Sequence, residues 1–169
     1  MPRPIEHRTR SSYPAAEVFA ALTDEEFLRE RLRRIGGKRS ELTSYTTSGN
    51  TTRYTLRQTI DARHLPSAAR TVIRGDLVIE RVESWTGGNG QYDGTVDAHV
   101  PHTPGSARAV TSLLDADAGS ELLFTGTVKV SVPLVGGRLE DMIVEQLTDL
   151  LDAEGEFTQH WLESRDATP

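Results

Sequence analysis

GGRLEDMIVEQLTDLLDAEGEFTQHW, residues 136–161, is the longest helical pattern in the chain, and it dictates what must surround it. After the two glycines, apolar side chains recur at the three- and four-residue intervals of one helix face. The expected stripe consists of Leu139, Ile143, Gln146, Leu150, Phe157 and Trp161, flanked by Met142, Leu147 and Leu151. A helix over residues 138–161 is roughly 35–40 Å long at ~1.5 Å per residue. With no second helix of similar length, its apolar side requires a broad, curved sheet as cover.

The residues before this helix have the pattern of strands joined by short turns. Strands are expected near residues 5–13, 39–47, 51–61, 77–85, 91–100, 107–114 and 122–132. Between the first two strands, Pro14 begins one short helix and the pair Gly36 and Gly37 ends another. Short turns between consecutive strands indicate antiparallel pairing. The sequence therefore predicts an α+β fold with six to seven strands, in a single domain over residues 1–163 with a frayed tail over 164–169.

The composition excludes several classes of protein. The formal net charge is −6. From Gly136 onward the sequence has nine acidic residues and only two basic ones, Arg138 and Arg165. The acidity thus belongs to the outer face of the last helix, which argues against a nucleic-acid partner, since such proteins present a basic face. An arginine-rich segment over residues 29–39 is interpreted as a solvated helix face, with docking to an acidic partner as the alternative.

No residue pattern predicts a cofactor or a metal site. The chain has no cysteine, which excludes disulfides and thiolate ligands. The glycines of residues 87–90 lie between two strands and fit a hairpin turn, because a phosphate cradle would open a helix. Pro101 and Pro104 place His99 at a strand end and His102 in a loop, and no third ligand is evident. No apolar run reaches the ~20 residues of a membrane span and no signal peptide is evident, so a cytoplasmic protein without integral membrane association is expected.

Two features place polar groups where a core is expected. Gln146 lies within the apolar stripe, so backbone, water or a ligand must satisfy it. In the strand over residues 77–85, Arg81 and Glu83 share the face of Leu77 and Trp85. Either a bulge switches the register, which we favour, or both charges point inward and pair with each other or with an anionic ligand group.

The chain resembles the START and Bet v 1-like helix-grip superfamily, the polyketide cyclase and lipid-transport group. The resemblance rests on the opening stretch YPAAEVFAALTD (residues 13–24), on the strand ending at Trp85 and on VPLVGGRLE (residues 132–140). The finer likeness is to an actinobacterial branch described as a domain of unknown function. It implies a curved antiparallel sheet wrapped on the C-terminal helix, with a pocket between them for lipids, polyketides or similar molecules. It supplies no catalytic residue.

The leading hypothesis is a non-enzymatic protein that binds a hydrophobic or amphipathic small molecule between sheet and helix. The expected lining residues are Phe27, Tyr54, Leu56, Trp85, Tyr92, Phe124, Met142, Gln146 and Leu150. One alternative is an enzyme of the cyclase or hydratase type, for which Glu83, Glu154 and His7 are the candidate groups. Another is a co-chaperone-like interaction module. The sequence leaves the oligomeric state open.

Overall fold

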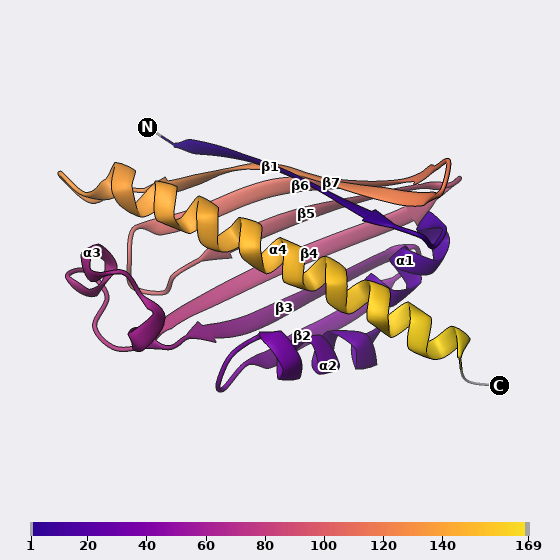
Figure 1. Cartoon of the computed structure of the whole chain (residues 1–169), viewed down its shortest axis with the longest axis horizontal. Helices are drawn as coiled ribbons and strands as arrows, with labels where there is room; N and C mark the ends of the chain where they lie inside the picture. Colours follow the sequence, from indigo (N-terminus) through magenta and orange to yellow (C-terminus); the bar gives the residue numbers. More distant parts are fainter. Residues whose placement is uncertain (1, 168–169) are drawn as a thin grey trace.

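Seven strands form one antiparallel sheet in the computed structural model, which describes residues 2–167 (Figure 1). The strands are β1 (Arg3–Ser11), β2 (Glu41–Ser48), β3 (Thr51–Ile60), β4 (Leu77–Gly88), β5 (Gln91–His99), β6 (Gly105–Ala116) and β7 (Gly119–Val130). The helices are α1 (Ala15–Leu22), α2 (Glu25–Ile35), α3 (Ser67–Arg70) and α4 (Gly136–Asp166), with a 3₁₀ turn over Ala62–His64. The predicted α+β architecture, with two short helices after the first strand, is confirmed.

The strand order places the first two strands at opposite edges of the sheet. β2 to β7 follow one another as neighbours, and β1 then pairs with β7. α1 and α2 therefore carry the chain from one edge to the other. Asp24 caps α2 by accepting a hydrogen bond from the Phe27 N–H, and the helix ends at Gly36. The turn between β4 and β5 is a hairpin at Asn89 and Gly90, both with positive φ, as expected.

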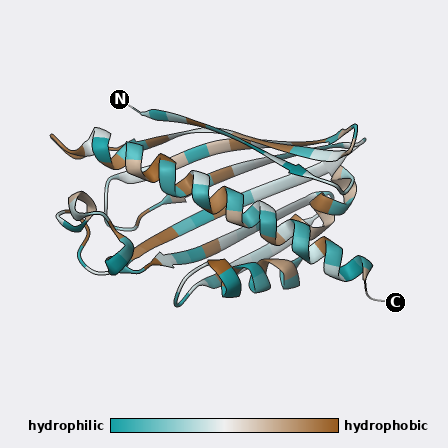
Figure 2. Cartoon of the chain, in the orientation of Figure 1, coloured by the Kyte–Doolittle hydropathy of each residue, from teal (hydrophilic) through white to brown (hydrophobic). Residues whose placement is uncertain are grey.

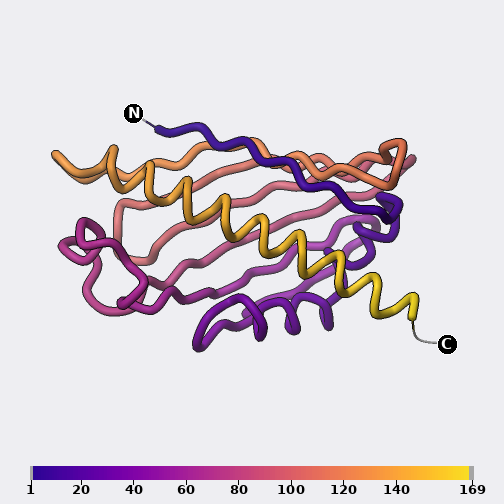
Figure 3. Tube along the Cα trace, viewed as in Figure 1, coloured from indigo at the N-terminus to yellow at the C-terminus, as the bar shows by residue number. Residues whose placement is uncertain are grey.

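α4 lies across the concave face of the sheet, and the strands curve around it (Figures 1 and 3). Its 31 residues exceed the predicted range at both ends. Residues 164–166 of the expected tail are helical, while residues 168–169 lie outside the described chain. At its start the chain approaches the sheet closely, because a Cβ on Gly136 would lie 2.6 Å from the Val130 carbonyl oxygen.

The buried face of α4 is rotated from the predicted one. Its buried side chains are Leu139, Glu140, Glu154, Thr158 and Leu162, with Leu147 and Leu151 half-buried between them. Apolar and polar bands alternate along the helix, as expected for one buried face (Figure 2). Gln146 is exposed, so the prediction that it faces the sheet is wrong. Leu147, one residue on and about 100° around the helix, takes that inward position.

β4 runs without a bulge along both neighbours. Its register with β3 is continuous from Thr86 opposite Thr51 to Leu77 opposite Ile60. The favoured interpretation of a bulge is therefore wrong, and Arg81 and Glu83 both point inward, where they are buried. Over residues 2–167, no helix combines the length and apolarity that a membrane span requires.

Candidate functional site

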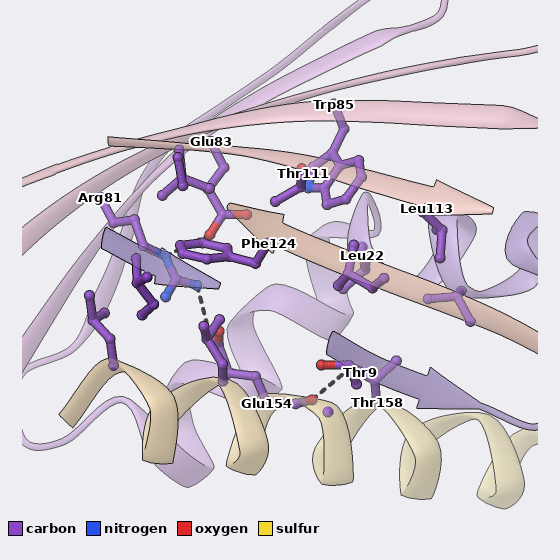
Figure 4. Close-up of a pocket in the computed structure, with 18 of the residues that line it drawn as sticks. Thr9, Leu22, Arg81, Glu83, Trp85, Thr111, Leu113, Phe124, Glu154 and Thr158 are labelled. Carbon is purple, nitrogen blue, oxygen red and sulfur yellow. Dashed lines mark hydrogen bonds and ion pairs between the residues drawn. The ribbon is translucent and has the colours of Figure 1, made fainter. Parts of the chain in front are cut away.

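An internal cavity of about 90 Å³ lies between the concave face of the sheet and α4 (Figure 4). Its apolar wall includes Val18 and Leu22 from α1, Trp85 from β4, Leu113 from β6, Phe124 from β7, and Leu147 and Leu151 from α4. These residues come from elements far apart in sequence, which meet because the sheet wraps the helix. The cavity is therefore a product of the whole fold.

Four buried charged residues line the same cavity and form what we call the buried tetrad: Arg31, Arg81, Glu83 and Glu154. The Nε of Arg81 lies 2.6 Å from a carboxylate oxygen of Glu83, and its Nη2 donates to Glu154 at 2.7 Å. Arg31 approaches Glu154 with an Nε–Oε2 distance of 3.3 Å. Figure 4 shows Arg81 and Glu154 pointing toward each other across the space between β4 and α4. The tetrad thus joins α2, β4 and α4 through two formal positive and two formal negative charges.

The pairing within the tetrad favours the charged forms of Glu154 and Arg81 and the neutral form of their neighbour Tyr54. Burial alone would raise the pKa of Glu154, but Arg31 and Arg81 outweigh it and lower that pKa. Burial opposes the charge of Arg81 as well, yet Glu154 and Glu83 raise its pKa. Burial, and next the charge of Glu83, raise the pKa of Tyr54 well above its usual range. Tyr54 therefore remains a donor, and its hydroxyl donates to Glu83 at 2.7 Å.

Four polar atoms on residues of the cavity wall are buried and have no hydrogen-bond partner among residues 2–167: Arg31 Nη2, Arg81 Nε, Thr111 Oγ1 and Ser120 Oγ. Arg81 Nε still has the Glu83 carboxylate beside it as an ion-pair partner. Buried polar atoms in folded proteins are nearly always paired. Among residues 2–167, no three acidic or histidine side chains lie close enough together to hold a metal ion. The arrangement is chemically suited to hydrogen bonding with an organic molecule.

The structure brings part of the predicted site together. Among the nine predicted lining residues, Trp85 and Phe124 line the cavity. Phe27, Tyr54 and Leu56 are fully buried in the core beside it, and Tyr92 stacks on Phe19 with ring centroids 4.4 Å apart. Met142 and Leu150 are half-buried on α4 and lie outside the lining, and Gln146 is exposed.

Two of the three candidate catalytic groups line the cavity in the structure, and the third does not. Glu83 and Glu154 lie on the cavity wall. His7 does not, and its Nε2 is 2.7 Å from a carboxylate oxygen of Asp152. Its side chain is only 10% exposed and shares one side of β1 with Ile5 and Thr9, which do line the cavity.

Sequence reasoning missed Arg31, which it grouped with the exposed arginines of residues 29–39. A signal was present, since Arg31 follows Phe27 by four residues and Leu28 by three. That spacing puts it on the apolar face of α2. Its guanidinium lies 5.6 Å from the centre of the Phe27 ring, which supports it from below.

Comparison with protein families places the chain. Residues 6–162 match the family described as "Protein of unknown function (DUF2505)". The chain belongs to this family. Two relatives of this DUF2505 protein are the uncharacterized proteins Rv0481c of Mycobacterium tuberculosis and Mb0491c of Mycobacterium bovis. Each is 26% identical over 170 residues, covering 96% of this chain and 98% of the relative. The expected actinobacterial branch is thereby confirmed.

Solved structures confirm the helix-grip, Bet v 1-like fold of the DUF2505 protein. The crystal structure of Ara h 8.0201 matches with a TM-score of 0.59 at 14% identity, covering 97% of this chain and 99% of that one. Norcoclaurine synthase from Thalictrum flavum matches with a TM-score of 0.58 at 13% identity, covering 96% and 87%. The protein of unknown function SA2116 from Staphylococcus aureus has a TM-score of 0.59 at 11% identity, covering 96% and 97%. At these identities the likeness concerns the fold alone.

Proposed function

We propose that this DUF2505 protein binds a small, mainly apolar molecule in the cavity between the sheet and α4. The observation that carries the proposal is an apolar cavity with a buried, charge-balanced tetrad in its wall. A concave apolar site with a few convergent polar groups is the usual form of a small-molecule site. The Bet v 1-like neighbours support a ligand-binding use of this fold in general.

The buried tetrad is better explained by a role in ligand binding than by a role in stabilising the fold. Buried ion pairs contribute little net stability, because removing two charges from water offsets most of their attraction. A closed core would be served as well by apolar side chains of similar volume. Charged groups with shifted pKa values on a cavity wall are instead typical of functional sites.

The cavity volume limits the size of the ligand. An engineered apolar cavity of roughly 150 Å³ holds benzene, so the 90 Å³ present here accommodates about four non-hydrogen atoms by the same proportion. A lipid or polyketide requires a larger space, of the ~300–1,000 Å³ found for drug-sized ligands. Such a molecule enters only when α4 moves away from the sheet. The closed form therefore favours a small ligand, or the small end of a larger one.

A surface groove beside α4 supplies a route of entry. It has a volume of about 910 Å³ and lies between the end of β1, the β6–β7 turn and α4. Five residues belong to the linings of both groove and cavity: Thr9, Arg10, Ser11, Ser120 and Gly155. At this seam α4 and β1 are close, since a Cβ on Gly155 would lie 2.6 Å from Thr9 Cγ2. A small separation of the two elements would connect the groove with the cavity.

The enzyme hypothesis has weaker support. Glu83 and Glu154 lie on the wall, but arginines hold both carboxylates, and the lowered pKa of Glu154 makes it a poor proton donor at neutral pH. The acidic outer face of α4 supplies no further argument for an interaction module.

Nuclear magnetic resonance tests the proposal, because the chain's two tryptophans differ in position. Trp85 lines the cavity, whereas Trp161 packs against Phe27 outside it. Small probes of four non-hydrogen atoms, such as acetone and isobutene, should shift the Trp85 indole N–H signal saturably and leave Trp161 unchanged. The proposal is wrong if no probe produces a saturable shift, or if both tryptophans respond alike.

A further inference from the structure

Arg31, a residue of the cavity wall, carries a buried hydrogen-bond donor that has no partner among residues 2–167. This donor is Nη2, and Arg31 as a whole is only 3% exposed. Its Nε faces Glu154 at 3.3 Å. The Phe27 ring lies beneath the guanidinium. The donor is thus held in one place by two neighbours.

We propose that Arg31 Nη2 receives a neutral oxygen acceptor of the ligand, such as a ketone, ester or ether oxygen. This inference rests on the proposed function and specifies its ligand class. A guanidinium has only donors, so a partner of Nη2 must be an acceptor. An apolar occupant would leave the buried donor unsatisfied, which costs binding free energy.

The charge balance of the site selects a neutral acceptor over an anion. Arg31 and Arg81 are matched by Glu83 and Glu154, and Tyr54 stays protonated, so the formal charges of the buried residues at the cavity sum to zero. Arg10 and Arg108 also line the cavity, but their side chains are exposed to solvent. A carboxylate ligand would bring an unmatched negative charge into a buried site already containing two carboxylates. A neutral acceptor satisfies the donor without adding charge.

The two unpaired hydroxyls on the wall are compatible with this ligand class. Thr111 Oγ1 and Ser120 Oγ each can donate or accept, so they adapt to a second polar atom of the ligand. They do not select charge or donor type. Arg31 is therefore the residue that determines specificity.

Three probes of one shape test the inference. Acetone, isobutene and acetate each have four non-hydrogen atoms in a planar, branched arrangement, which matches the size limit of the cavity. They differ in presenting a neutral acceptor, no acceptor and a charged acceptor. In the ¹⁵N-labelled protein, acetone should shift the Trp85 indole and Arg31 side-chain signals. These shifts should reach saturation at millimolar acetone concentrations. Isobutene and acetate should each bind at least about tenfold more weakly.

The substitution Arg31→Lys isolates the donor from the charge. Lysine keeps the positive charge beside Glu154 but lacks the forked nitrogen, so the dissociation constant for acetone should rise at least about tenfold. Arg33→Lys is the matched control, because Arg33 is exposed on the same helix and pairs with Glu30. It should bind acetone as the unmodified protein does. The three-probe comparison decides the question even where Arg31→Lys fails to fold.

The possible outcomes separate the inference from the proposed function. Equal binding of isobutene and acetone overturns the role of the acceptor and leaves a ligand-binding cavity. Tighter binding of acetate overturns the preference for a neutral group. Failure of all three probes to bind overturns the inference together with the proposed function.

Discussion

The residues that define the site are the polar ones placed where apolar residues would pack more simply. Arg31 and Glu154 occupy apolar faces of α2 and α4, and both are buried. Each is stable there only because the other elements bring a partner of opposite charge. The tetrad therefore acts as a unit, and removing one member affects the rest.

Glu154→Gln should destabilise the fold strongly. The substitution leaves Arg31 and Arg81 with only Glu83 as a counter-charge in a buried site, which costs about 3–5 kcal/mol. Urea unfolding followed by circular dichroism measures the difference. Glu156→Gln, an exposed change two residues on, serves as control and should alter stability little. A loss below about 1 kcal/mol for Glu154→Gln would show that the tetrad is not coupled as described.

Acid should weaken the fold through Glu154. Its pKa is lower in the folded protein than its ordinary value of 4.5, so its contribution is complete above that value and is lost as the pH falls below it. The unmodified protein should therefore lose more stability between pH 6 and pH 3 than Glu154→Gln does.

Salt separates this effect from surface carboxylates. Arg33 and Arg34 lower the pKa of Glu30 to about 2, but that cluster is exposed and is screened at roughly 0.5 M NaCl. The difference between the unmodified protein and Glu154→Gln should persist at this ionic strength. Parallel acid unfolding of the two proteins would contradict the buried pairing.

Tyr54→Phe should cost about 1–3 kcal/mol, because it removes the hydrogen bond from Tyr54 to the buried Glu83 carboxylate. Tyr92→Phe is the control, since Tyr92 is half-buried and phenylalanine keeps its stacking on Phe19. Thermal unfolding of both variants provides the comparison. Equal losses would indicate that the Tyr54 hydroxyl is not engaged.

At the scale of elements, the sequence predicted the strands and helices closely and the orientation of α4 poorly. Alternation and turn residues depend on local chemistry, so all seven strands were found. The inward face of α4 could not be fixed locally, because its apolar stripe is broad enough to choose Gln146 and Leu150 in place of Leu147 and Leu151. The choice depends on the crossing of α4 over the sheet.

The same limit applies to the site. Trp85 and Phe124 were identified because large apolar residues on an inward strand face line any cavity there. The tetrad was predicted only as an alternative pairing of Arg81 and Glu83. The other two tetrad residues, Arg31 and Glu154, reach the site only because α2 and α4 pack against β4. The periodicity of a sequence does not reveal contacts between residues so far apart in the chain. A polar residue at a regular apolar spacing, as at Arg31, is the local signal that remains.

The seam between α4 and β1 is fitted to a glycine. Gly155→Ala places a methyl group 2.6 Å from Thr9 Cγ2, and this clash should outweigh the gain in helix propensity and destabilise the fold by about 1–2 kcal/mol. In a Thr9→Ser background the Cγ2 is absent, and Gly155→Ala should become neutral or stabilising by up to about 1 kcal/mol. Denaturant unfolding of the four proteins gives the coupling directly. Equal effects in both backgrounds would show that the seam is loose.

At the scale of the molecule, the sheet wraps α4 and encloses a small cavity beside it. The fold joins this DUF2505 protein to the Bet v 1-like proteins, whereas the function that we propose depends on the charges and size of this particular cavity. A site for about four non-hydrogen atoms, with one unused arginine donor, is a specific expectation for the chain.

A crystal structure of the protein in saturating acetone tests this account most directly. The account predicts ordered density for one acetone molecule in the cavity, beside Trp85, with its oxygen about 2.7–3.2 Å from Arg31 Nη2. A cavity closed by its own side chains, or one that contains only water under these conditions, would contradict it.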